Sequence, residues 1–226
     1  MTDFSEMRRE MIRETVGKPA AHLPSAFSIL EIVWAIYEAM GPNDRFILSK
    51  GHGVLALYAV LKERGLVEGD YGLWPGHPDA RLLPQVEFST GSLGHGLALA
   101  AGVALGKRLK LEPGQVFCLL GDGECMEGSV WEAYRLISRL QLNVLTIVDF
   151  NKTHPGALPA DYFDVLECEG HDADWMKELF RLSDHRLIYA NTTKGHGCSI
   201  FEDDPEAWHH RSPTDQELPA LLEAVK

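Results

Sequence analysis

Two short polar segments, each directly after a predicted strand, carry the residues best suited to chemistry. Gly-Asp-Gly-Glu at 121–124 follows the apolar run 115–120, and Asn151 follows the apolar run 143–149. β-branched and large apolar residues fill both runs without helical spacing, which indicates buried strands. Residues 126–140 have the length and apolar spacing of a helix. The unit is therefore strand–helix–strand, and its parallel strands end at the same edge of a sheet.

A side-chain oxygen at each strand end could hold a divalent cation. Asp122 and Asn151 offer a carboxylate and an amide oxygen, and phosphate oxygens and water could complete the coordination of Mg²⁺. Gly121 and Gly123 would let the backbone approach a diphosphate, and the helix start at Glu124 would offer N–H groups to an anion. Taken alone, Gly-Asp-Gly could equally be a tight turn. Asn151, at the end of the next strand, favours a Mg²⁺–diphosphate site over a simple turn.

Composition limits the class of protein. The chain has 226 residues, 45% of them hydrophobic, which suits one domain with a substantial core. A net charge of −12 without a basic patch argues against a nucleic-acid partner. The longest apolar run, 97–106, is too short to span a membrane, and the first residues do not resemble a signal peptide. Four cysteines without CxxC spacing favour a reduced, cytoplasmic protein.

The remaining pattern alternates helices and strands. Gly and Pro mark a loop at 71–84, and short strands are expected at 45–50 and 185–192. Apolar spacing and helix stop signals predict helices over 4–16, 29–40, 54–64, 93–109, 172–182 and 214–225. We therefore expect one α/β domain over residues 1–226, a parallel sheet with helices on both faces.

The order of these motifs resembles the N-terminal, diphosphate-binding half of the transketolase family, from about residue 8 to 225. Gly-Asp-Gly followed at a distance by Asn is the sequence signature of proteins that bind thiamine diphosphate. Met-Glu-Gly at 126–128 and Trp-Glu-Ala at 131–133 narrow the resemblance to the transketolase family. The resemblance implies a thiamine diphosphate-binding fold. It also implies thiamine diphosphate as cofactor, with Mg²⁺, or Ca²⁺ or Mn²⁺ in its place.

The resemblance also implies which residues hold the cofactor. His52 of Ser-Lys-Gly-His-Gly would contact the diphosphate, and the segment that follows Thr90 would pass against the thiamine rings. The metal ligands would be Asp122, Asn151 and the backbone carbonyl of Thr153. The implied cofactor-binding set is His52, Gly91, Ser92, Leu93, Gly121, Asp122, Gly123, Glu124, Asn151 and Lys194.

Three histidines would move protons on substrate hydroxyls: His22, His77 and His209. His22 lies between Ala21 and Pro24, where relatives have glycines, so a core or capping role is the alternative for it. His209 aligns more naturally than His210, but the irregular loop leaves the choice between them open. Glu127 joins the catalytic set because, with Glu132, it resembles acidic residues that link two active sites in relatives; ordinary helix carboxylates are the alternative.

The implied reaction transfers a two-carbon ketol unit from a ketose to an aldehyde or other acceptor. We expect the ketose to be phosphorylated. Full-length relatives continue into a pyrimidine-binding domain, which we expect to be absent from this chain. We therefore expect the N-terminal subunit of a split enzyme, paired with a separate C-terminal-half subunit in an α₂β₂ assembly. An E1-like 2-oxoacid decarboxylase or dehydrogenase subunit is an alternative. A noncatalytic degenerate homologue is another, suggested by the altered 20–25 loop and the shortened 71–84 and 152–169 loops.

Overall fold

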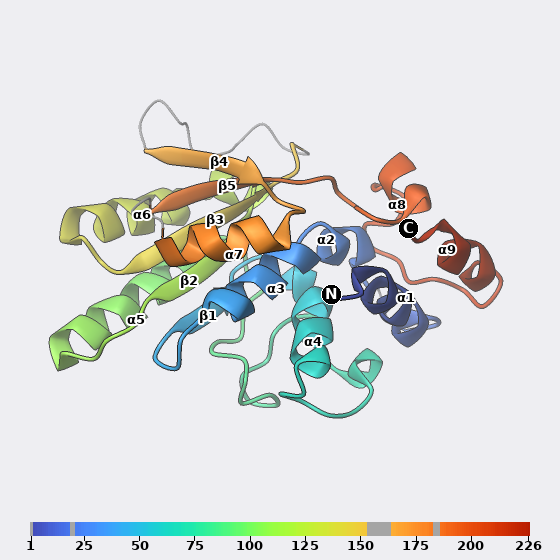
Figure 1. Cartoon of the computed structure of the whole chain (residues 1–226), viewed down its shortest axis with the longest axis horizontal. Helices are drawn as coiled ribbons and strands as arrows, with labels where there is room; N and C mark the ends of the chain where they lie inside the picture. The colour runs from blue at the N-terminus through green and yellow to red at the C-terminus, as the bar shows by residue number, and fades with distance from the viewer. Residues whose placement is uncertain (1, 19–20, 153–163, 183–185) are drawn as a thin grey trace.

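The computed structural model describes residues 2–18, 21–152, 164–182 and 186–226, and it is built on one parallel sheet (Figure 1). The strands run in the order β1-β2-β3-β5-β4, and every pairing is parallel. Their bounds are β1 Arg45–Leu48, β2 Val116–Gly121, β3 Val144–Phe150, β4 Val165–Glu169 and β5 Leu187–Asn191. In a parallel sheet all carboxyl ends meet at one edge, so the segments that follow β1, β2, β3 and β5 are brought together.

Helices cover both faces of this sheet, as expected. Along β2, Phe117 and Leu119 pack with one apolar cluster and Cys118 and Leu120 with the other, because successive side chains of a strand point to opposite faces. α5 (Gly96–Lys110) and α6 (Gly128–Leu140) supply the cluster around Cys118. The opposite cluster comes from α1 (Phe4–Thr15), α2 (Leu23–Phe27), α3 (Leu30–Ala39), α4 (Val54–Glu63) and α7 (Ala173–Leu182).

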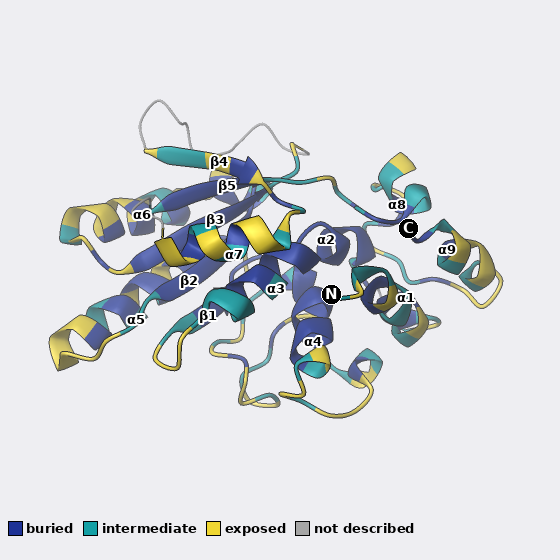
Figure 2. Cartoon of the chain, viewed as in Figure 1, coloured by how far each residue is buried: buried dark blue, intermediate teal, exposed yellow. Residues whose placement is uncertain are grey.

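Burial is deepest where the two layers meet the sheet. Figure 2 shows the central strands as buried along their length, while the outer surfaces of α5, α6 and α7 are exposed. The C-terminal segment extends beyond the sheet with α8 (Ser199–Asp203) and α9 (Leu218–Ala224) (Figure 1). No helix within the described ranges is long and apolar enough to cross a membrane. All four cysteines lie in the described part of the chain, buried and without a disulfide between them.

The predicted elements are confirmed in type, with several corrected boundaries. The expected helix 29–40 is preceded by a separate short helix, α2, that begins with a proline in its first turn. The expected helix 93–109 begins only at Gly96, because Gly94 has a φ of +84° that an α-helix cannot include. A 3₁₀ turn over Gly123–Met126 precedes α6, which therefore begins at Gly128 and not at residue 126. The expected helix 214–225 is shorter in the structure and forms α9.

Two elements were not anticipated. β4 adds a fifth strand at the edge of the sheet within the 152–169 segment, which was expected to be only a shortened loop. α8 forms a single turn of helix after Cys198. Residues 153–163 lie outside the described part of the chain, and so does the predicted metal ligand Thr153.

Candidate active site

A cavity of about 400 Å³ opens at the carboxyl edge of the sheet. It is formed where the loops after β1, β2, β3 and β5 meet the start of α2 and the loop before α9. The lining residues are His22, Ser25, Lys50, His52, His77, Gly91, Leu93, Gly121, Asp122, Gly123, Glu124, Met126, Asn151, Lys194, His209 and His210. Most of the predicted site residues therefore come together in one place, although they span nearly the whole chain.

The Gly-Asp-Gly-Glu loop is held by hydrogen bonds of its own carboxylates. Asp122 is 4% exposed, and its Oδ1 accepts from the backbone N–H of Gly123 at 2.7 Å. Glu124 accepts from Ser49 Oγ at 2.5 Å and from the backbone N–H groups of Gly94 at 2.9 Å and Gly121 at 3.3 Å. Burial raises the pKa of Glu124, against the opposing effect of these hydrogen bonds. Glu124 thus joins three loops at the floor of the cavity.

The two predicted metal ligands lie together on the cavity wall, and their chemistry fits a hard cation. Gly121 pairs in register with Asp149, so Asp122 and Asn151 follow neighbouring strands at nearly the same height. Asn151 donates Nδ2 to Asp149 Oδ2 at 3.1 Å, which turns its amide oxygen away from Asp149. A carboxylate oxygen and an amide oxygen are ligands that suit Mg²⁺. The donor set present therefore fits the metal expected from the sequence.

A buried ion pair beside this site was missed from the sequence. Lys50 Nζ lies 2.5 Å from Asp149 Oδ2, and the two side chains are 2% and 0% exposed. Asp149 also accepts from Ser28 Oγ at 2.8 Å and from the Thr192 hydroxyl. Burial alone would raise the pKa of Asp149, but Lys50 and these hydroxyls hold it below the ordinary 3.8. Asp149 thus joins the ends of β1, β3 and β5 under the cavity floor.

Five imidazoles converge on the cavity: His22, His52, His77, His209 and His210. The ring centroid of His22 lies 5.5 Å from that of His52 and 6.2 Å from that of His77. Both His209 and His210 reach His22, with centroids 5.2 and 4.5 Å away. The sequence left open which of His209 and His210 reaches the cavity, and in the structure both do.

The first three of these histidines are neutral near pH 7. Burial, followed by the neighbouring imidazoles and Lys194, lowers the pKa of His22 to about 4. Burial and then Lys50 lower the pKa of His52 to about 2, and burial also lowers the pKa of His77. A neutral imidazole keeps one N–H and one lone pair, so it can both donate and accept.

Lys194 reaches the cavity from the turn that follows β5, and this turn is held from two sides. On one side Thr192 donates to Asp149. On the other, His171 Nε2 accepts from the backbone N–H of Thr193 at 2.9 Å, while its Nδ1 lies 3.4 Å from Oε2 of buried Glu31. Burial lowers the pKa of Lys194. Lys194, a member of the predicted cofactor-binding set, therefore lines the cavity.

The segment after Thr90 is only partly in the cavity. Gly91 and Leu93 are among its lining residues, whereas Ser92 and Glu127 are not. Gly91 has a φ of +140°, and a Cβ there would come within 2.6 Å of His77 Cδ2. Glu127 lies at the start of α6, on the exposed surface beside the cavity. Gly91 and Leu93 thus join the cavity, while the cofactor contact of Ser92 and the role of Glu127 stay predictions.

Three lining residues were given no role from the sequence: Ser25, Lys50 and Met126. For Lys50 a signal existed, since a lysine directly follows a buried strand beside Gly-His-Gly. For Ser25 the signal was a hydroxyl three residues after His22, within the first turn of α2.

An all-parallel α/β domain with an acidic Gly-Asp-Gly loop, a spaced Asn and a histidine-lined cavity at its carboxyl edge defines a diphosphate-binding protein. Residues 17–155 match the family model described as transketolase, thiamine diphosphate binding domain. Together with the relatives described next, this match shows that the chain belongs to the transketolase family.

Relatives match the chain over nearly its whole length. One of the subunits of apulose-4-phosphate transketolase from Actinobacillus succinogenes is 32% identical, over 97% of this chain and 93% of that protein. Transketolase-like protein 2 of Homo sapiens is 33% identical over 98% of this chain but only 41% of its own length. The crystal structure of transketolase from Campylobacter jejuni superposes with a TM-score of 0.73 at 25% identity, over 97% of this chain and 40% of that one. The chain is thus similar along its length to a transketolase that is divided into subunits, and also to part of larger transketolases.

Proposed function

We propose that this chain is the N-terminal subunit of a split, thiamine diphosphate-dependent transketolase. It transfers a two-carbon ketol unit from a ketose to an aldehyde or other acceptor. The observation that carries the proposal is the convergence of the Asp122–Asn151 pair and five histidines on one cavity, in a chain similar over its whole length to one subunit of a divided transketolase.

The pair of hard ligands, Asp122 and Asn151, supports a proposal for where the diphosphate binds. Asp122 and Asn151 would hold Mg²⁺, or Ca²⁺ or Mn²⁺ in its place, and with it the diphosphate of the cofactor. His52, Gly121 and Gly123 line the same cavity and would contact the diphosphate, and Lys194 would compensate anionic charge in a protein of net charge −12. Gly91 and Leu93 would pass against the thiamine rings. Thiamine diphosphate, when bound, supplies the carbon centre that accepts the ketol unit.

The histidines act on the substrate. His22, His77 and His209 line the cavity, and the ring of His22 has its centroid 6.2 Å from that of His77 and 5.2 Å from that of His209, so the three would meet the same donor and acceptor hydroxyls. Because His22 and His77 are neutral near pH 7, each can accept a hydroxyl proton on its ring lone pair and return it later. His52, with its pKa lowered to about 2, stays neutral throughout and acts as a hydrogen-bond donor.

A phosphorylated ketose is the donor class that we propose. Two relatives similar over their whole length, from Actinobacillus succinogenes and Phocaeicola vulgatus, are named as subunits of apulose-4-phosphate transketolase. Apulose 4-phosphate is therefore the first donor to test. A separate C-terminal-half subunit would supply the pyrimidine-binding domain, and the working unit would be an α₂β₂ heterotetramer in the cytoplasm. Glu127, exposed beside the cavity, would contact a neighbouring subunit.

The experiment mixes this chain with a transketolase C-terminal-half subunit, thiamine diphosphate and Mg²⁺, and offers either a ketose phosphate together with an aldehyde acceptor or a 2-oxoacid. Mass spectrometry of the products should show two-carbon transfer from the ketose and no decarboxylation of the 2-oxoacid. Decarboxylation would instead assign an E1-like activity. An assembled mixture that turns over neither substrate would favour a noncatalytic homologue.

A further inference from the structure

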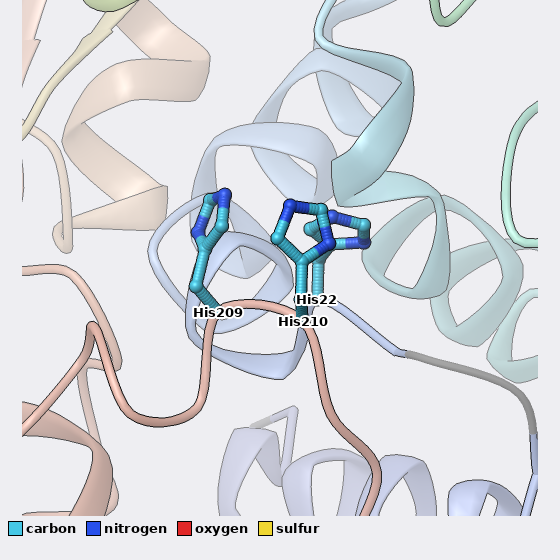
Figure 3. A group of neighbouring side chains, drawn as sticks. All are labelled: His22, His209 and His210. Atoms are coloured by element: carbon cyan, nitrogen blue, oxygen red, sulfur yellow. The ribbon is translucent and has the colours of Figure 1, made fainter.

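Three of the cavity histidines are arranged so that their ring planes meet instead of stacking (Figure 3). His22 and His210 have centroids 4.5 Å apart at 71°, His209 and His210 4.5 Å apart at 89°, and His22 and His209 5.2 Å apart at 90°. One ring nitrogen of each lies within 4.8 Å of the others. Imidazole lone pairs lie in the ring plane, so three crossed rings can direct them at one point.

A second group in the described part of the chain has ligand atoms equally close but lacks this geometry. In the group of Glu31, His171 and His196, the two rings stack at 3.5 Å with only 15° between their planes. Lone pairs in parallel planes do not converge on one ion. His171 Nε2 is moreover engaged by the N–H of Thr193, and its Nδ1 faces Glu31. This group is a hydrogen-bonded support for the turn that carries Lys194.

The chemistry of the first group selects the type of cation. Imidazole nitrogen suits Zn²⁺ and its neighbours in the transition series, whereas Mg²⁺ prefers oxygen. Metal binding needs neutral imidazole, which is the main form of an ordinary histidine near pH 7. Zn–N bonds of about 2.0–2.1 Å in a tetrahedral site place the ligand nitrogens roughly 3.4 Å apart. His210 is exposed on a loop, so small ring rotations can close the remaining distance.

Nearby cations do not leave the group strongly positive. Lys194 lies close enough to lower the pKa of His22, but Asp122, Asp149 and Glu206 face Lys194 in turn. Lys50 is paired with Asp149. A divalent ion can therefore enter beside compensated charges.

We propose that His22, His209 and His210 form a binding site for Zn²⁺ or a similar borderline divalent cation, distinct from the Mg²⁺ site at Asp122 and Asn151. Three imidazoles leave the fourth tetrahedral position open to water or to a substrate oxygen. Binding of the ion does not depend on the proposed function. Its consequence does: an ion held by His22 and His209 would occupy the space of the donor hydroxyls and inhibit ketol transfer.

The test uses Co²⁺ as a coloured substitute for Zn²⁺, added to the full chain in excess Mg²⁺ so that oxygen sites are already filled. The chain should develop the intense visible absorption of tetrahedral Co²⁺, which one equivalent of Zn²⁺ abolishes. His210→Ala should weaken Co²⁺ affinity at least as much as the roughly 10–100-fold lost when an outer hydrogen-bond partner of a metal ligand is removed. His196→Ala is the matched control, since it removes a histidine from the stacked group and should leave the absorption unchanged.

The opposite results in these variants would contradict the proposed metal site. Absorption that survives His210→Ala at full affinity, or that disappears in His196→Ala, would place the metal elsewhere. Absence of tetrahedral absorption in the folded chain would show that no such site exists. In the assembled enzyme, micromolar Zn²⁺ should inhibit competitively with the donor, and a chelator should reverse it. If the mixture has no ketol-transfer activity but the absorption behaves as expected, the proposed function fails while the metal site stands.

Discussion

The buried pair of Lys50 and Asp149 gives the sharpest test of how the cavity floor is built. At 2.5 Å, two unit charges attract by about 7 kcal/mol with an effective dielectric constant of ~20. Desolvation of two side chains that are 2% and 0% exposed offsets much of this attraction. Removing one partner loses the attraction but keeps the desolvation of the other. Lys50→Met should therefore lower the free energy of unfolding by about 3–5 kcal/mol.

Urea unfolding of a double-mutant cycle measures this directly. Asp149→Asn keeps an oxygen for Ser28 and Thr192 but removes the charge. The double variant contains no unpaired buried charge, so it should be less destabilised than the sum of the single variants, with a coupling of at least about 2 kcal/mol. Lys110→Met is the matched control: Lys110 is 72% exposed, and the change should stay within about 0.5 kcal/mol.

The pH dependence of stability provides an independent check. Because the folded pKa of Asp149 lies below the ordinary 3.8, its contribution is complete above about pH 5 and is lost progressively as the pH falls through the folded pKa. Asp149→Asn should lack this acid-dependent component. Additive single variants in the urea cycle, or an unchanged acid profile for Asp149→Asn, would refute the view that this pair holds the ends of β1 and β3 together.

Three further predictions concern the cavity itself. Asp122→Ala should abolish Mg²⁺-dependent binding of thiamine diphosphate in calorimetry of the assembled complex while circular dichroism stays unchanged; undiminished affinity would contradict the metal assignment. His77→Ala should leave cofactor affinity nearly unchanged and lower turnover by roughly 10²–10⁴-fold, and a normal kcat/KM would return His77 to a structural role. Gly91→Ala should reduce stability by about 1–3 kcal/mol in urea, because a side chain at φ +140° is strained and meets His77; equal stability would show that the loop adapts.

Much of the fold was predictable because its signals are local. The runs 115–120 and 143–149 are apolar without helical spacing, and they became β2 and β3. The rule that parallel strands end at one edge then places Asp122 and Asn151 together from the sequence alone. β4 was missed because Val165–Glu169 is a short edge strand with alternating acidic residues and half-exposed apolar ones, which resembles a loop.

The positions of individual side chains in the site were less predictable from the sequence. Whether His209 or His210 reaches the cavity depends on the path of an irregular loop, for which no periodicity exists. The role of Glu124 as a joint between Ser49, Gly94 and Gly121 depends on contacts between distant segments. Lys50 is similar, since a lysine at the end of a strand is buried only where a carboxylate from another strand meets it.

The central claim is that this chain works only with a second subunit, and donor cleavage measures it most directly. With an aldehyde acceptor present, release of the carbonyl product from a ketose phosphate should be followed with this chain by itself, with a C-terminal-half transketolase subunit by itself, and with their mixture, always with thiamine diphosphate and Mg²⁺. We expect activity only in the mixture, with both subunits eluting together in gel filtration. Full activity of this chain alone, or inactivity of the co-eluting mixture, would contradict the claim.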